Sequence, residues 1–225
     1  YLAGALLAAA PRLPGARGVW LAAALAGSVA TTFAMGAAGG FTAFAALRFL
    51  GGMASAFVLV LATAIVLDRL SAAGRPGLGA LHFAGVGTGI AVSALVLSPP
   101  FAGGLSWPGQ WWSAGAAALV LALVALVLLH GAGARGGAGV PGAAGMTRPA
   151  VLRRWILAYG LFGFGYVVTA TFLVAIVRGD AGLRSLEPWV WLLVGITAAP
   201  SVHLWSRIGL RIGPAPAFAA AALLE

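Results

Sequence analysis

Two long apolar segments, joined by a short polar connector, constrain the fold of this chain more than any other feature. They lie between Phe41 and Pro99 and are about 26 and 20 residues long. A hydrocarbon core about 30 Å thick is crossed by roughly 20 helical residues. Neither segment has the period-two alternation of a membrane barrel strand. We therefore predict a transmembrane helical hairpin, with Asp68 and Arg69 ending its first helix.

The composition fits an all-α membrane protein and excludes several other classes. Hydrophobic residues make up 62% of the chain and charged residues 8%, so this sequence cannot provide a water-soluble surface. The net charge of +9 comes from 13 basic residues, all arginines. They stand singly or in pairs between apolar runs, whereas a nucleic-acid interface needs them clustered on one face. The absence of cysteine excludes disulfides and thiolate metal sites.

The hydrophobicity pattern predicts six complete spans and a seventh that begins near Pro214. The complete spans are expected at residues 19–37, 42–66, 79–98, 111–130, 154–177 and 188–206. Residues 131–150, rich in Gly, Ala and Pro, are predicted to be a flexible cytoplasmic linker between an N-terminal half, 1–130, and a C-terminal half, 151–225. Because both ends of the sequence lie inside apolar runs, we expect the chain to be truncated at both ends relative to a longer protein.

The arginines predict the orientation of these spans. If the turn at residues 11–18 is cytoplasmic and each span crosses once, ten arginines fall in the cytoplasm, two fall outside and Arg48 lies within a span. This is the bias of the positive-inside rule. The tryptophans all fall at predicted helix ends, where they act as interface anchors.

Arg48 is the only charged residue placed well inside a predicted span. It lies about six residues, or about 9 Å, from the middle of that span. It either extends to the outer interface or faces a polar cavity, since charges inside membranes are costly and often mark a transport path. Gly52 and Ser55 share its helical face. We predict that Arg48 and Ser55 line a cavity and that Gly52 leaves room for helix packing.

A second polar face occurs in the span at 154–177. Tyr159, Phe162, Tyr166 and Thr169 fall on one side of the helix. Hydroxyl groups at membrane depth need partners, which are either neighbouring helices or the water and solute of a cavity. Both alternatives stand. We predict that this face and Arg48 line one water-accessible cavity.

Other motifs favour packing over chemistry. Gly85 and Gly89 lie in a GxGxG sequence that lacks a preceding strand, so we interpret them as a helix-packing face and not as a nucleotide loop. His82, His130 and His203 are far apart in the sequence and lack metal-ligand spacing, so no metal site or cofactor is predicted. No motif of a hydrolase or metalloprotease is present, and an enzyme is not expected.

Three segments resemble the YbfB/YjiJ-like branch of the major facilitator superfamily. They are Leu-Arg-Phe-Leu-Gly-Gly-Met-Ala-Ser-Ala and its continuation to Leu70 (47–70), Leu-His-Phe-Ala-Gly-Val-Gly-Thr-Gly-Ile (81–90) and Tyr-Gly-Leu-Phe-Gly-Phe-Gly-Tyr (159–166). The resemblance implies twelve helices in two halves, with this chain running from the end of helix 2 to the start of helix 9. It also implies that Arg48 on helix 4 and Tyr159 and Tyr166 on helix 7 face the solute cavity.

The sequence departs from the superfamily's gating motif. That motif has the pattern Gly-x-x-x-Asp-Arg-x-Gly, and the corresponding stretches at 8–17 and 205–213 both lack the acid. The usual gating salt bridge is therefore not expected.

The resemblance implies a secondary-active transporter in the bacterial inner membrane, a multi-pass protein that moves a small-molecule substrate by alternating access. The alternative is a non-transporting polytopic membrane protein, such as a receptor or an assembly factor. Any acid that couples transport to a proton is expected in the missing helices, because none lies inside a span of this sequence. The lipid bilayer is the expected partner, and nucleic acid is not.

Overall fold

The computed structural model describes residues 1–10, 13–131 and 149–224, and these residues are folded almost entirely into helices, with no strand among them. The all-α fold class is therefore confirmed. Six of the helices are long and apolar enough to cross a membrane. They correspond one to one to the six predicted spans. The predicted linker at 131–150 falls almost wholly outside the described residues, so the division into two halves there stays a prediction.

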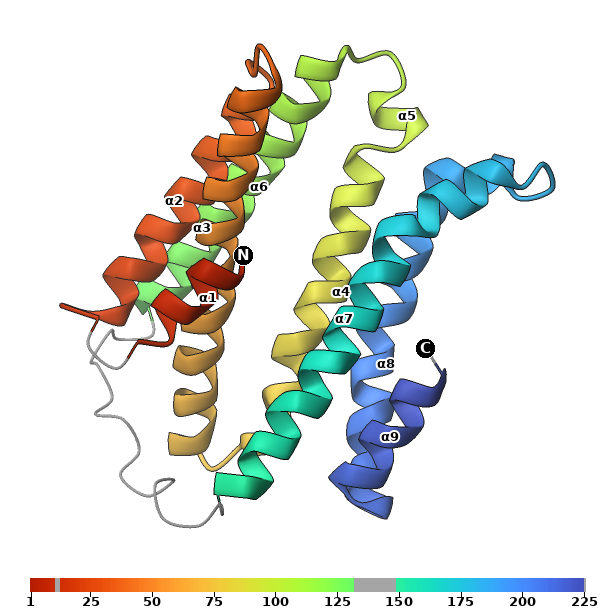
Figure 1. Cartoon of the computed structure of the whole chain (residues 1–225). Helices are drawn as coiled ribbons and strands as arrows, with labels where there is room; N and C mark the ends of the chain where they lie inside the picture. Colours follow the sequence, from red (N-terminus) through yellow and green to blue (C-terminus); the bar gives the residue numbers. More distant parts are fainter. Residues whose placement is uncertain (11–12, 132–148, 225) are drawn as a thin grey trace. The chain divides into compact units, whose positions relative to one another are not determined.

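The helices group into two structural units, which are described separately (Figure 1). The first unit contains α1 (Leu2–Ala8), α2 (Arg17–Met35), α3 (Phe41–Ala72), the short helices η1 (Pro76–Leu78) and α5 (Pro99–Ala102), and α6 (Trp107–Gly131). The second unit contains residues 80–94 of α4 (Gly79–Val96), then α7 (Pro149–Gly179), η3 (Arg184–Trp189), α8 (Val190–Ile212) and α9 (Pro214–Leu224).

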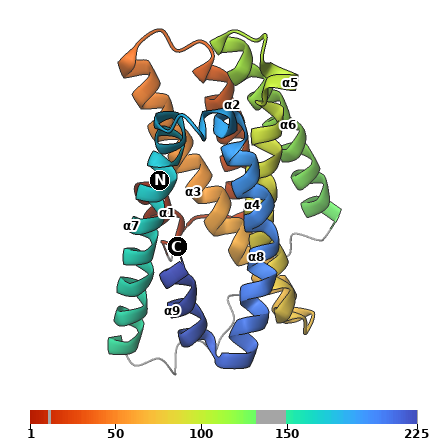
Figure 2. The same cartoon turned by 90° about the vertical axis from the view of Figure 1, so that its right-hand side faces the viewer.

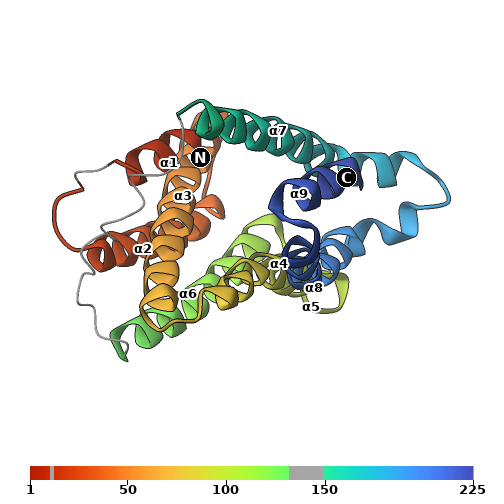
Figure 3. The same ribbon diagram turned by 90° about the horizontal axis from the view of Figure 1, so that it is seen from below.

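In the first unit, α3 packs against both α1 and α2, and α6 packs against α2 (Figure 3). The turn between α2 and α3 includes Gly40, whose φ of +152° suits glycine and few other residues. Beyond this turn α3 returns antiparallel to α2, and the stacked rings of Trp20 and Phe57 join the two helices with centroids 5.9 Å apart. At the far end, Arg17 at the start of α2 forms an ion pair with Asp68 near the end of α3 at 3.1 Å.

Glycines allow α2 and α6 to approach closely. A Cβ atom added at Gly115 of α6 would meet the ring of Phe33 on α2 at 2.8–2.9 Å, closer than van der Waals contact permits. At Gly36, an added Cβ would overlap the indole of Trp112. Each glycine thus leaves the space that an aromatic ring of the other helix occupies, a common way for membrane helices to pack.

In the second unit, α9 turns back after Gly213 and packs against α8 (Figure 2). Gly213, the C-cap of α8, has a φ of +91° and a ψ of 157°, a backbone conformation that glycine adopts readily and other residues rarely do. Phe218 of α9 contacts two rings of α7, with centroids 5.9 Å from Trp155 and 5.6 Å from Phe162.

Residues 87–91 of α4 also pack closely on α8. A Cβ added at Gly87 would lie 2.5 Å from the backbone nitrogen of Ala199, and one added at Gly195 would overlap the backbone of Ala91. The two backbones therefore approach each other along a stripe of small residues.

Several predicted boundaries differ from those of the structure, and the end of α3 shows why. The helix predicted at 42–66 extends to Ala72, so Asp68 and Arg69 lie inside α3 and do not end it. It ends two residues before Gly74, whose φ is +67°. Charged side chains mark where a helix leaves the hydrocarbon, but the hydrogen-bonded backbone continues until a residue can adopt the left-handed conformation. The loop after residue 98 also contains the short helix α5, which begins with two prolines, Pro99 and Pro100.

Candidate functional site

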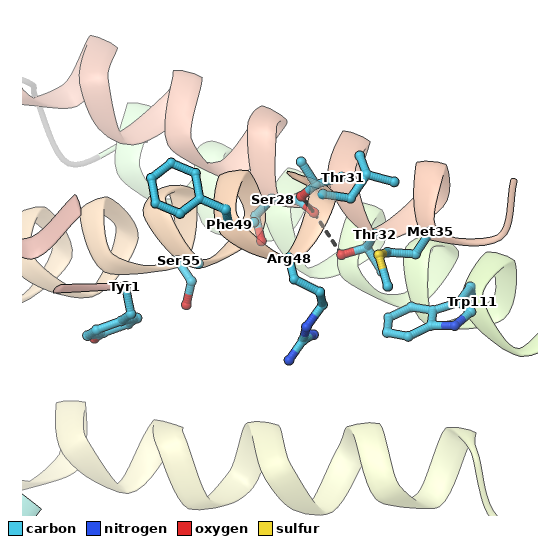
Figure 4. Close-up of a pocket in the computed structure, with 12 residues that line it drawn as sticks. Tyr1, Ser28, Thr31, Thr32, Met35, Arg48, Phe49, Ser55 and Trp111 are labelled. Atoms are coloured by element: carbon cyan, nitrogen blue, oxygen red, sulfur yellow. Dashed lines mark hydrogen bonds between the residues drawn. The ribbon is translucent and has the colours of Figure 1, made fainter. Parts of the chain in front are cut away.

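A pocket of about 650 Å³ lies in the first unit, between polar side chains of α2 and the Arg48 face of α3 (Figure 4). Helix α2 provides Ser28, Thr31, Thr32 and Met35, which recur at the three- and four-residue spacing of one helical face. The other lining residues are Tyr1, Leu47, Arg48, Phe49, Gly51, Gly52, Ser55 and Trp111.

The threonine hydroxyls of this pocket bond to the backbone of their own helix. Thr31 donates to the carbonyl oxygen of Gly27 at 2.8 Å, and Thr32 donates to that of Ser28 at 2.7 Å. Such bonds satisfy hydroxyl groups at membrane depth without a second helix. The oxygen atoms of both threonines still have lone pairs that can accept a hydrogen bond from a solute.

Arg48 is the one charged side chain among the described residues that line the pocket. Its side chain is exposed and extends from α3 between Ser55 and Trp111 (Figure 4). Among the described residues it makes no hydrogen bond or ion pair, and no acidic residue lines the pocket. An arginine at membrane depth without a partner costs about 2.5–3.5 kcal/mol at the helix centre and less nearer the interface. The pocket therefore offers a positive charge that lacks a protein counter-ion within the described part of the chain.

The sequence-predicted residues Arg48, Gly52 and Ser55 all lie at this pocket. At Gly52, a Cβ would lie 3.1 Å from the backbone nitrogen of Tyr1, so a larger residue would crowd the segment that leads into α1. Their role in solute binding stays a prediction.

The predicted aromatic face of α7 lies in the second unit. Tyr159 is 68% exposed and Tyr166 is 45% exposed, whereas Phe162 packs on Phe218 of α9. Thr169 is exposed as well, and among the described residues its hydroxyl makes no hydrogen bond. The face thus combines one packed ring with exposed polar groups. That it lines a cavity together with Arg48 stays a prediction.

The predicted packing glycines of α4 differ from the glycine that makes the close contact. Gly85 and Gly89 have no atoms within 4 Å of an added Cβ, while Gly87 between them touches the backbone of α8. A packing role for Gly85 and Gly89 stays a prediction.

The described residues contain no group of three or more His, Cys, Asp or Glu side chains that could hold a metal ion. The acids of this part of the chain lie near helix ends. Asp68 pairs with Arg17, and Glu187 accepts a 2.9 Å hydrogen bond from Nε of Arg178.

Sequence reasoning missed the contribution of α2 to the pocket. Ser28, Thr31, Thr32 and Met35 have a regular helical spacing that could have been recognised in the sequence. The sequence indicates Trp111 only as an interface anchor, yet its indole also lines the pocket.

Six membrane-length apolar helices and a predominantly helical fold define an integral, multi-pass membrane protein. A family model described as "Uncharacterised MFS-type transporter YbfB" matches residues 1–225, and the chain therefore belongs to this family of major facilitator transporters. This confirms the resemblance seen in the sequence. No curated protein and no solved structure matches the chain.

Proposed function

We propose that the protein is a secondary-active transporter that moves a small solute across the bacterial inner membrane by alternating access. The family supports transport in general. The observation that carries the finer proposal is the Arg48 pocket, a polar cavity in a helix bundle that is otherwise apolar. Polar groups within membrane spans usually mark a solute or ion path because they are costly elsewhere.

The depth of the pocket fits this function. Ser55 lies about one residue from the midpoint of the apolar stretch 41–67, so it falls near the bilayer midplane, where secondary transporters hold their solutes. A coupling proton would have to use an acid outside the middle of these spans. Among the described residues, the acids are Asp68, Asp180 and Glu187, and all three lie near helix ends.

Alternating access can be tested before the solute is known. Since residues 1–225 contain no cysteine, Ser55→Cys can be introduced into the whole gene product as a unique thiol once any cysteine elsewhere in that product has been replaced by serine. We expect it to react with a membrane-impermeant methanethiosulfonate reagent added to right-side-out vesicles and, separately, to inside-out vesicles. Leu50→Cys is the matched control, because Leu50 is 52% exposed on α3 but does not line the pocket. A thiol that faces lipid reacts from neither side, since the reactive thiolate does not form there.

Reaction of Ser55→Cys from one side alone would contradict alternating access and indicate a fixed crevice. Planar-bilayer recordings provide a second control. Two-sided reactivity with measurable ionic conductance would indicate a continuous pore and would also reject the proposal.

A further inference from the structure

We propose that the Arg48 pocket binds a small organic monoanion, a carboxylate attached to an apolar or aromatic body. This inference rests on the proposed transport function and names the substrate class of the same site. It follows from three properties of the pocket, which are its charge, its free hydrogen-bond donors and its apolar lining.

Charge is the first property. The lining contains one arginine and, among the described residues, no carboxylate that could neutralise it. A cationic solute would meet repulsion without a compensating acid, and a neutral solute would leave the guanidinium without a counter-charge. An anionic solute supplies the missing counter-charge. The guanidinium also presents paired N–H groups whose geometry matches the two oxygens of a carboxylate.

The free donors point the same way. Among the described residues, the hydroxyls of Ser28 and Ser55 and the indole N–H of Trp111 make no hydrogen bond, although all three side chains line the pocket. The hydroxyls of Thr31 and Thr32 already donate to the backbone. The pocket therefore holds several unused donors beside the arginine, the complement of a group that only accepts hydrogen bonds.

The apolar lining defines the rest of the solute. Met35, Leu47, Phe49 and Trp111 surround the polar groups, and Met35 is only 3% exposed. A volume of about 650 Å³ falls within the range of small-molecule sites. Thioether, aliphatic and aromatic groups together accept an apolar body, with favourable ring–ring and sulfur–ring contacts for an aromatic one.

The number of charges restricts the anion further. One guanidinium balances one negative charge, and no second cationic side chain lines the pocket among the described residues. A phosphate monoester carries close to two charges at neutral pH. It would bring an uncompensated charge into a low-dielectric site. A monocarboxylate is therefore favoured over a phosphate ester.

The test uses matched pairs of anionic and neutral probes on the purified whole gene product in detergent. Thermal unfolding is titrated with benzoate and benzamide, then with hexanoate and hexanamide, because a ligand of the folded state raises the unfolding temperature according to its affinity. We expect at least one carboxylate to bind about tenfold or more tightly than its amide, the scale of a charge-assisted hydrogen bond. Phenyl phosphate should bind more weakly than benzoate.

Variants locate the effect. Arg48→Gln should remove the preference for the carboxylate, and Arg48→Lys should restore it only in part, because an ammonium cannot reproduce the paired donors. Arg75→Gln is the matched control, an arginine in the connector outside this pocket, and should leave the preference unchanged. If an Arg48 variant fails to fold, the comparison of carboxylate with amide binding to the wild-type protein still tests the proposal.

Equal binding of acid and amide in both pairs, or binding of neither, would overturn the proposal, as would tighter binding of phenyl phosphate than of benzoate. These outcomes are distinct from failure of the transport proposal. Two-sided reactivity of Ser55→Cys without carboxylate preference removes only the substrate class, whereas carboxylate preference with one-sided reactivity removes only alternating access.

Discussion

Gly115 provides the sharpest test of how the first unit is held together. Its replacement by alanine adds a single methyl group at the contact between α6 and α2. That methyl would lie 2.8–2.9 Å from three ring atoms of Phe33, including Cγ next to the backbone of α2. Because the obstructing atoms are near the start of a stiff side chain, the ring cannot rotate away, and the two helices must separate.

The magnitude follows from two opposing effects. Alanine favours a helix over glycine by about 0.8–1 kcal/mol. Overpacking by a methylene-sized group costs about 1–3 kcal/mol. A glycine in open space shows only the first effect. Gly160→Ala in α7 is therefore the matched control, because nothing lies within 4 Å of a Cβ added there. We expect Gly115→Ala to be less stable than Gly160→Ala by about 1–3 kcal/mol.

The assay is equilibrium unfolding of the purified protein in mixed micelles with increasing sodium dodecyl sulfate, followed by tryptophan fluorescence. A double-mutant cycle with Phe33→Leu isolates the contact, because the smaller side chain makes room for the methyl. The coupling should favour the double variant by about 1 kcal/mol or more. If Gly115→Ala is as stable as Gly160→Ala, or if Phe33→Leu brings no relief, the proposed packing of α6 on α2 is wrong.

Two further predictions concern orientation and surface charge. Ala72→Cys should react with an impermeant maleimide only after cells are opened. Gly104→Cys should react in intact cells once any outer membrane is permeabilised. The reverse pattern would show that the predicted orientation in the membrane is wrong. Asp68→Asn removes the ion pair with Arg17. Because the Asp68 side chain is 38% exposed and that of Arg17 is 50% exposed, the substitution should lower the unfolding temperature only slightly. The difference should disappear at about 1 M salt, where charges more than about 3 Å apart are screened, and a large shift that survives salt would show a more deeply coupled pair.

The positions of the spans could be predicted because apolar length is a strong signal in a membrane protein. Their ends could not all be predicted in the same way. The charges of Asp68 and Arg69 predict the end of α3 there, but the helix continues to Ala72. The actual stop signal, Gly74 followed by Pro76, was present in the sequence. Backbone conformation decides the end of a helix, whereas side-chain charge decides where it leaves the lipid.

The candidate site was only half visible in the sequence. Arg48 stands out as the one charge inside a span, and Ser55 follows from helical spacing. The contribution of α2 to the pocket depends on which face of that helix turns towards α3. From the sequence alone, Thr31 and Thr32 could equally face another helix. Periodicity reveals that a face exists, but tertiary packing determines its neighbour.

The length of α3 has a consequence for the membrane around the protein. Its apolar stretch, 41–67, is about 40 Å long at about 1.5 Å per residue, which exceeds a hydrocarbon thickness of about 30 Å. A helix with this excess accommodates hydrophobic mismatch by tilting, and it tilts further as the bilayer becomes thinner. The depth of Arg48 below the lipid headgroups therefore varies with the composition of the bilayer. Lipid chain length thus changes the free-energy cost of keeping this arginine without a counter-charge.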